Sequence, residues 1–226
     1  MKFCHHCAGP ITHHVPAGDD KMRYCCISCD VVFYQNPNNI VGTVPVFEDK
    51  VLLCRRAIEP RLGKWTLPAG FMENGETTLS GAVRETREEA GANIVLGKGS
   101  LYTLFNLPYI NQVYLFFLAH LADLDFAPGI ESLEVRLFAE HEVPWNEIAF
   151  PVVRSTLEHY FADRRAGTFP VRMFDVPQAD RPSDFARRQA SPSRSRRSGC
   201  ALSCTATPCA FASRNTRSRS YAMPSL

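Results

Sequence analysis

The chain has 226 residues, of which 45% are hydrophobic, and its 25 Lys and Arg side chains nearly balance 23 Asp and Glu. This apolar fraction is ordinary for a globular protein and excludes a wholly disordered chain. The best apolar run, Val113–Leu121, is much shorter than the roughly 20 residues of a membrane-spanning helix, so we expect no transmembrane segment. An N-terminus without an apolar signal segment favours the cytoplasm, where nine cysteines are not expected to form a disulfide framework.

The net charge of +2 is unevenly distributed along the chain. Residues 182–226 contain eight Arg, ten Ser and one acidic residue, whereas residues 1–181 carry more acidic than basic side chains. We therefore expect residues 177–226 to form a disordered tail. Such a tail is either inert or a basic arm that binds RNA or anionic membrane. An inert tail of this composition can arise when a GC-rich coding strand is translated out of frame or when a stop codon is lost.

The predicted elements follow the chain in order. Residues 1–30 are rich in Cys and His and contain almost no aliphatic run, so hydrophobic burial alone cannot build a core there. Glu48–Asp49 predicts a tight hairpin, and helical periodicity predicts helices over Thr77–Ala90 and Pro151–Arg165. Runs rich in β-branched, aromatic and leucine residues predict five strands, which are Ile40–Phe47, Lys50–Arg56, Ser100–Phe105, Val113–Leu121 and Leu133–Phe138.

Four cysteines near the N-terminus have the spacing of a metal site. They form two C-x2-C pairs with 18 residues between them, Cys4 with Cys7 and Cys26 with Cys29. Two such pairs predict a closed, tetrahedral structural Zn2+ site on a small ribbon. The alternative is reduced free cysteines or a redox pair, although a redox C-x-x-C centre would need only one of the two pairs. Neighbouring side chains that could replace a ligand are Cys25, His5, His6, His13 and His14.

Three carboxylates gather on the first predicted helix. At 100° per residue, Glu85, Glu88 and Glu89 share an arc of about 100°. Oxygen ligands at this density suit Mg2+ or Mn2+ rather than zinc, although a solvated acidic face is the alternative. Arg84 lies four residues before Glu88 and can pair with it. The adjoining face is expected to pack on a sheet and consists of Leu79, Ala82, Val83, Thr86 and Ala90.

The segment that contains these carboxylates resembles the Nudix box, G-x5-E-x7-R-E-U-x-E-E-x-G-U. It matches the fixed positions with Gly70, Glu76, Arg84, Glu85, Glu88, Glu89 and Gly91. The resemblance implies an α/β protein with a Nudix α/β/α sandwich and mixed sheet over residues 35–176, preceded by a zinc ribbon over residues 1–34. It also implies metal-dependent hydrolysis of a nucleoside diphosphate linked to another moiety.

The resemblance implies roles for individual residues. Glu85 and Glu89 would be the main metal ligands, Glu88 would ligate or bridge, and the carbonyl of Ala69 would contribute. Arg84 and Glu76 would support them. A further acid is expected to act as base or extra ligand, and the candidates are Glu131 and Glu134. Glu134 is preferred because it directly precedes the strand segment Val135–Phe138, with a surface carboxylate as the alternative for either.

Further stretches resemble plant chloroplast-type FAD/ADP-ribose pyrophosphohydrolases and their bacterial relatives. They are Tyr34–Pro37, Val51–Arg56, Trp65–Gly70 and Pro128–Phe138. The predicted activity is therefore Mg2+-dependent cleavage of FAD or ADP-ribose to release AMP. The alternatives are a pyrophosphatase for NADH or oxidised nucleotides and, in a different class, a nucleotide-sensing regulator that binds nucleic acid.

The remaining expectations concern partners and substrate contacts. We expect a small-molecule nucleotide substrate, a homodimer, no membrane and at most weak nucleic-acid binding through the tail. Arg55 and Arg56 are candidates to reach phosphates, although they are equally consistent with solvated strand ends. Candidates for stacking on adenine or flavin, with core packing as the alternative, are Phe47, Trp65, Phe105 and Tyr109.

Overall fold

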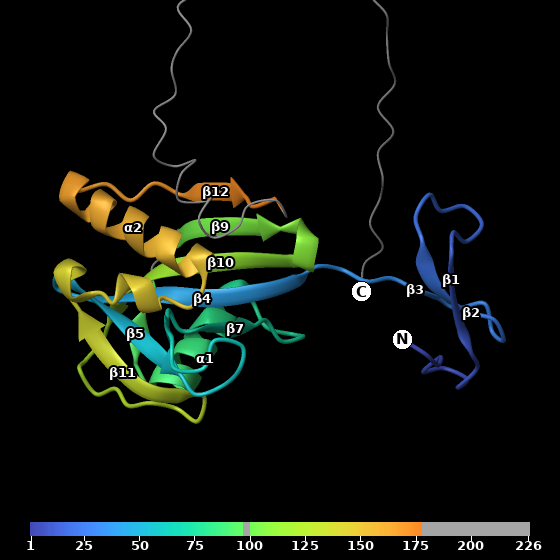
Figure 1. The fold of residues 1–226 in the computed structure, drawn as a ribbon, viewed down its shortest axis with the longest axis horizontal. Coiled ribbons are helices and arrows are strands. Elements are labelled where there is room, and N and C mark those ends of the chain that lie inside the picture. Colours follow the sequence, from blue (N-terminus) through green and yellow to red (C-terminus); the bar gives the residue numbers. More distant parts are fainter. Residues whose placement is uncertain (97–99, 178–226) are drawn as a thin grey trace, which may run out of the picture. The chain divides into compact units, whose positions relative to one another are not determined.

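A computed structural model describes residues 1–96 and 100–177 (Figure 1). The predicted tail lies outside the described residues from position 178 onward. Within the described residues there are two sheets, one of three strands and one of nine strands. No helix in this part of the chain has the length and apolarity needed to cross a membrane.

The N-terminal sheet is antiparallel and small. Its strands are β1 (Ile11–His14), β2 (Arg23–Cys26) and β3 (Val32–Phe33), in that order. Its buried cluster contains Cys4, Cys26 and Phe33, so cysteines supply much of the buried surface of this unit. Such a small apolar cluster needs another source of stability, as its composition predicts.

The larger sheet is mixed. β4 runs parallel to β10 and β9 runs parallel to β12, whereas its other pairings are antiparallel. Its main path is β11 (Ser132–Phe138), β5 (Lys50–Arg56), β4 (Asn38–Phe47), β10 (Gln112–Leu121), β9 (Leu101–Leu107) and β12 (Arg172–Asp175). Short strands β6 (Trp65–Thr66), β7 (Ala69–Phe71) and β8 (Ile94–Val95) pair with β5, β4 and β10.

Two helices cover opposite faces of this sheet (Figure 1). On one face the hydroxyls of Thr43 in β4 and Thr86 in α1 (Thr78–Ala90) lie 2.7 Å apart. Val44 has the opposite orientation in the pleat and joins the core that α2 (Pro151–Ala166) covers. The predicted α/β/α sandwich is confirmed. Single 3-10 turns occur at η1 (Pro108–Ile110), η2 (Glu140–Glu142) and η3 (Trp145–Glu147).

Local sequence signals explain where α1 begins and ends. The side chain of Thr77 accepts a hydrogen bond from the backbone N–H of Ser80, and the Ser80 hydroxyl accepts one from the N–H of Thr77. This reciprocal cap satisfies amide groups that the helix itself leaves free. Gly91 ends the helix with φ of 62°, a left-handed conformation that costs glycine little.

The predicted elements are found with small shifts in their ends, but the predicted buried face of α1 is partly wrong. Leu79 and Val83 are 39% and 37% exposed, whereas Glu85 and Glu89 are buried. The helix is therefore rotated so that its carboxylates, rather than these two apolar side chains, face inward. The site next to the helix accounts for this departure from simple amphipathic packing.

Candidate functional site

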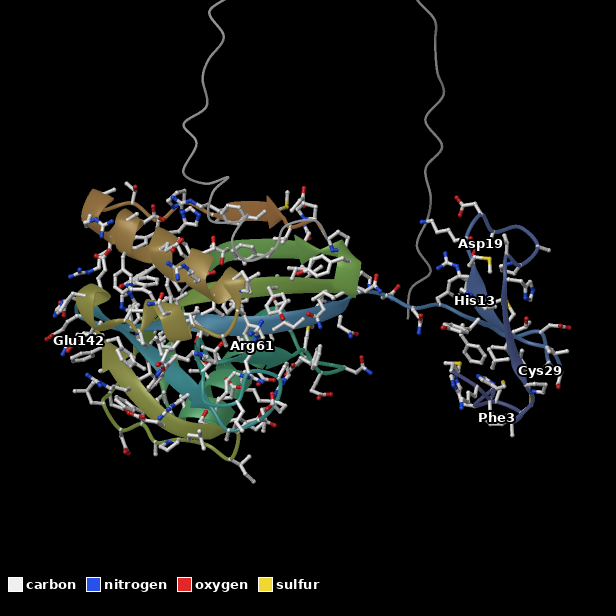
Figure 2. All side chains as sticks on the ribbon, in the orientation of Figure 1. Phe3, His13, Asp19, Cys29, Arg61 and Glu142 are labelled. Atoms are coloured by element: carbon white, nitrogen blue, oxygen red, sulfur yellow. The ribbon has the colours of Figure 1, made fainter. Side chains whose placement is uncertain are left out.

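Four cysteine sulfurs meet in the N-terminal unit. Cys7 Sγ lies 3.4 Å from both Cys26 Sγ and Cys29 Sγ, and Cys4 Sγ lies 3.7 Å from Cys29 Sγ (Cys29 is labelled in Figure 2). All four sulfurs lie within 4.8 Å of one another. Ligands about 2.3 Å from a tetrahedral zinc ion would be about 3.8 Å apart, so the cluster has the dimensions of a Cys4 zinc site.

The neighbouring candidate ligands lie outside this cluster. Cys25 is buried and its thiol donates to the carbonyl of Arg23. His5 packs edge-on against Phe33, and His13 packs against Tyr24. In the described N-terminal residues, the side chains whose ligand atoms lie close enough together to share a metal ion are these four cysteines.

Backbone amides point at two of the sulfurs. The N–H of His6 donates to Cys4 Sγ at 3.3 Å, and the N–H of Ser28 donates to Cys26 Sγ at 3.4 Å. Burial opposes ionisation of Cys26, but the N–H groups of Cys29 and Ser28 lower the pKa of its thiol to about 7. These amides favour thiolates, which are the form that binds zinc.

A cavity of about 940 Å3 lies in the larger unit. Its lining comes from β4, β7, α1, β10, the start of α2 and the β5–β6 loop, and it includes Arg61 from that loop (Figure 2). The acidic residues that line it are Glu73, Glu85, Glu88, Glu89 and Glu131. A volume of this size is at the upper end of the range for small-molecule sites.

Close backbone approach builds the carboxylate cluster. A Cβ atom on Gly70 would lie 2.4 Å from Oε2 of Glu85, so the absence of a side chain at Gly70 makes room for that carboxylate. The backbone N–H of Ala69 donates to Oε2 of Glu89 at 3.0 Å. The backbone of β7 therefore leaves space for the carboxylate of Glu85 and holds the carboxylate of Glu89 by a hydrogen bond.

Arg84 connects the carboxylates with one another. Its guanidinium lies 2.7 Å from Glu85, 2.9 Å from Glu88 and 2.8 Å from Glu76, and it also donates to the carbonyl of Phe71 at 3.1 Å. Arg84 thus holds three side chains of the helix region in fixed orientations. The hydrogen bonds from Arg84, together with the N–H of Glu73, lower the pKa of Glu76 to about 2.

Burial acts in the opposite direction on the two inner carboxylates. It raises the pKa of Glu85, and the ion pair with Arg84 offsets this rise in part. The pKa of Glu89 is raised to about 7, mainly by burial. The hydrogen bond from Ala69 lowers this pKa, and the negative charge of Glu85 raises it further. Neighbouring buried carboxylates of this kind are stabilised in their charged form by a bound cation, and their oxygens suit a hard divalent ion.

Of the two candidates for a further acid, Glu131 lines the cavity and Glu134 does not. Glu134 is on β11, with its side chain 46% exposed and one carboxylate oxygen 3.8 Å from Arg55. This position favours Glu131 over Glu134, the acid preferred from the sequence, as the further acid. Adjacency to a strand was a poor signal because the register of β11 directs this side chain to Arg55 on β5.

Of the two candidate arginines for binding phosphate, Arg56 lines the cavity and Arg55 does not. Arg55 donates to the carbonyl of Gly63 and lies beside Glu134. Arg56 lines the cavity, with its guanidinium carbon 5.2 Å from the ring centre of Phe150. Arg56 therefore supplies positive charge to the cavity.

Of the four aromatic candidates, Tyr109 lines the cavity and is 43% exposed. Trp65 and Phe105 are buried, in contact with Phe138 and Phe174, and Phe47 packs against another core cluster. Core packing therefore explains these three. Aromatic lining residues that the sequence did not single out are Phe71, Tyr114, Phe116 and Phe150.

Comparison with known proteins adds to this geometry. Residues 37–159 match the family model described as NUDIX domain, and residues 2–35 match the model described as Nudix N-terminal. The crystal structure of a NUDIX hydrolase from Nitrosomonas europaea is 52% identical with a TM-score of 0.76, and the match covers 79% of this chain and 100% of that chain.

Curated relatives match over less of their length. NAD-capped RNA hydrolase NudC of Stutzerimonas stutzeri is 28% identical over 178 residues, which are 75% of this chain and 59% of the relative. ADP-ribose pyrophosphatase of Methanocaldococcus jannaschii is 40% identical over 58 residues, which are 26% of this chain and 34% of the relative. The chain thus spans less than two thirds of either relative.

Proposed function

The chain belongs to the NUDIX family of hydrolases, and we propose that it cleaves the diphosphate of FAD or ADP-ribose with Mg2+ or Mn2+ and releases AMP. One observation carries the proposal: the carboxylates of Glu85, Glu88 and Glu89 line a cavity large enough for a nucleotide. Arg84 orients the carboxylates of Glu85 and Glu88 from within the same helix, and the backbone N–H of Ala69 orients that of Glu89.

The proposed metal site consists of Glu85 and Glu89, with Glu88 at its exposed side and the carbonyl of Ala69 nearby. When bound, the divalent ion neutralises diphosphate charge and lowers the pKa of a water molecule. Water adds to one phosphorus atom, the bond from that phosphorus to the bridging oxygen breaks, and a carboxylate oxygen of Glu131 accepts the proton of the water. Arg56, at the cavity wall, binds a phosphate oxygen of the substrate.

The rest of the cavity supports a substrate with large planar groups. Apolar and aromatic side chains on several elements line it, including Ile58, Leu107, Tyr109, Tyr114 and Phe150. Planar rings gain more from such walls than a ribose phosphate does. This lining supports FAD ahead of ADP-ribose, because the flavin adds a second ring system to the adenine.

We further propose that the cysteine cluster holds a structural Zn2+ and that two chains form a homodimer. The four sulfurs form a closed set that leaves no position for a substrate. Exposed apolar side chains in the described N-terminal unit, such as Phe3 at 67% and Ile27 at 62%, support burial against a partner. Light scattering of purified protein that gives the mass of one chain would contradict the dimer.

NADH or an NAD-capped RNA is the second candidate substrate. The observation that favours it is the match to a NudC protein over 75% of this chain. Oxidised nucleotides are a third candidate, since a relative named 8-oxo-(d)GTP phosphatase matches over 62% of this chain.

The test is a hydrolysis screen with Mg2+ on four substrates: FAD, ADP-ribose, NADH and 8-oxo-dGTP. We expect kcat/KM for FAD or ADP-ribose to exceed the other two values by about tenfold or more, about 1.4 kcal/mol in transition-state stabilisation. A preference for NADH or 8-oxo-dGTP would assign the cavity to that substrate instead and overturn the proposal.

A further inference from the structure

The loop that precedes β11 is hydrogen-bonded to the C-terminal end of α1. The backbone N–H of Ala127 donates to the carbonyl of Ala90, and the N–H of Gly129 donates to the carbonyl of Glu89, both at 3.0 Å. The last carbonyls of a helix have no partner within the helix. Here the loop supplies two of those partners, and one belongs to a proposed metal ligand.

Gly129 makes this contact possible because it lacks a side chain. A Cβ atom at this position would lie 1.7 Å from the carbonyl oxygen of Glu88 and 2.8 Å from its carbonyl carbon. Real Cβ atoms essentially never approach backbone this closely, so any other residue must push the loop and helix apart. The φ of Gly129 lies outside the left-handed region, so close packing alone requires glycine here.

The other end of the loop is also fixed. The N–H of Ser132 donates to the carbonyl of Gly129 at 3.0 Å, and the N–H of Ala57 donates to the carbonyl of Glu131 at 2.8 Å. Glu131 therefore lies between the end of α1 and the β5–β6 loop, and it is one of the residues that line the cavity. A displacement of Gly129 by the width of a methyl group would move Glu131 relative to the carboxylates of α1.

We propose that Gly129 is a positioning residue that sets the carboxylate of Glu131 against the carboxylate cluster of α1. This inference rests on the proposed function, because it assigns Glu131 the role of proton acceptor. The loop and the C-terminal end of α1 then form one rigid unit, held together by these hydrogen bonds and by the close packing of Gly129. Glu131 is then effective because of where Gly129 holds it.

A double-mutant cycle tests this relationship. Gly129→Ala should lower kcat about tenfold with KM changed less than threefold, and Glu131→Gln should lower kcat about a hundredfold. If Gly129 acts through Glu131, then adding Gly129→Ala to Glu131→Gln should change kcat less than twofold. Multiplicative losses in the double variant would show that Gly129 acts on the fold or on α1 and would overturn the proposal.

Two further variants separate positioning from lost stability. Gly167 is the C-cap of α2 and has φ of 71°, so Gly167→Ala strains the backbone. The added Cβ meets no atom within 4 Å, and this variant should leave kcat unchanged. Pro128→Gly loosens the loop without adding atoms, so it serves if Gly129→Ala fails to fold. Pro128→Gly should lower kcat in the wild-type chain, but it should not lower kcat further when it is added to Glu131→Gln.

A readout without catalysis completes the test. In metal-free protein, Gly129→Ala should speed amide hydrogen exchange in residues 126–131, whereas Glu131→Gln should not. Unchanged exchange in Gly129→Ala would refute the inference while leaving the proposed function intact. Wild-type kcat in Glu131→Gln would refute the inference and the role of Glu131 as proton acceptor, while leaving the hydrolysis itself intact. A wild-type chain that hydrolyses none of the four substrates would overturn both.

Discussion

The backbone N–H of Ala69 donates a 3.0 Å hydrogen bond to Oε2 of Glu89, which lies twenty residues later in the chain. This bond connects β7 with α1 and places the buried carboxylate beside the backbone of the cavity wall. One oxygen of Glu89 is thereby directed, and the other remains available to a cation. In the proposed metal site, this second oxygen binds the cation through the negative charge of the carboxylate.

Glu89→Gln should therefore reduce kcat about a hundredfold or more while the protein stays folded. Glutamine keeps the shape and can still accept from Ala69, but it removes the negative charge that a divalent ion requires. Steady-state kinetics with Mg2+ would measure the loss, and Glu85→Gln should behave alike. Glu158→Gln, in an exposed pair with Arg154, is the matched control. Turnover of Glu89→Gln within threefold of wild type would rule out its role as a ligand.

Purified protein should contain one tightly bound Zn2+ per chain. Cys26→Ser should lose it, because it removes one of four sulfurs within 4.8 Å of one another. The adjacent Cys25→Ser should keep it, because Cys25 bonds to the carbonyl of Arg23 instead. Elemental analysis of both variants measures this difference. Equal zinc contents in the two variants, or none in the wild type, would contradict the site.

Asp163→Asn should destabilise the larger unit by about 3 kcal/mol in urea unfolding at pH 7. Asp163 in α2 accepts from the two terminal guanidinium nitrogens of Arg172 and from the hydroxyl of Tyr102, the latter at 2.6 Å. It thus fastens α2 to β9 and β12. Glu140→Gln breaks an exposed pair with Arg165 and should cost about 1 kcal/mol or less.

The contribution of Asp163 should depend on pH with a defined sign. Burial raises the pKa of Asp163, but the hydrogen bonds from Arg172 and Tyr102 outweigh it, so the folded-state pKa is lowered. The stabilisation is therefore complete above the unfolded pKa of about 4 and is lost as pH falls through the lowered folded value. The difference in unfolding free energy between wild type and Asp163→Asn should shrink below pH 4, and a difference that grows there would refute this.

Much of the fold could be predicted because local signals agreed with tertiary packing. Lys50–Arg56 forms a strand with the predicted bounds, and the apolar stripe that includes Val153 and Leu157 is buried on α2. Strand β12, at Arg172–Asp175, was not predicted. It is short and at an edge of the sheet, and its pairing with β9 depends on contacts distant in sequence.

The site was predictable in composition but not in its contacts. The spacing of Glu85, Glu88 and Glu89 indicates their shared arc, whereas the need for Gly70 comes from the proximity of its backbone to Glu85. Likewise, no local pattern distinguishes Glu131 from Glu134. The loop contact made by Gly129 and the register of β11 give the two residues their different positions, and both are tertiary features.

A chain shortened to end at Asp180 should keep the wild-type hydrolysis rate, zinc content and melting temperature. Among the described residues, Val176 is the buried core residue nearest the C-terminus, and 79% of this chain matches the whole of the Nitrosomonas europaea structure. The shortened chain should lose nothing beyond weak, salt-sensitive nucleic-acid binding. A melting temperature lowered by several degrees, or a large loss of activity, would show that the removed segment contributes to the enzyme.

The central claim is that this cavity hydrolyses the diphosphate of a nucleotide such as FAD with a divalent ion held by the carboxylates of α1. Its most direct test is product analysis of FAD incubated with the full chain, with Mg2+, with a chelator, and with Glu89→Gln in place of wild type. We predict equimolar AMP and FMN with Mg2+ and about a hundredfold less product in the other two reactions. Equal product in the presence of the chelator, or from Glu89→Gln, would contradict the account.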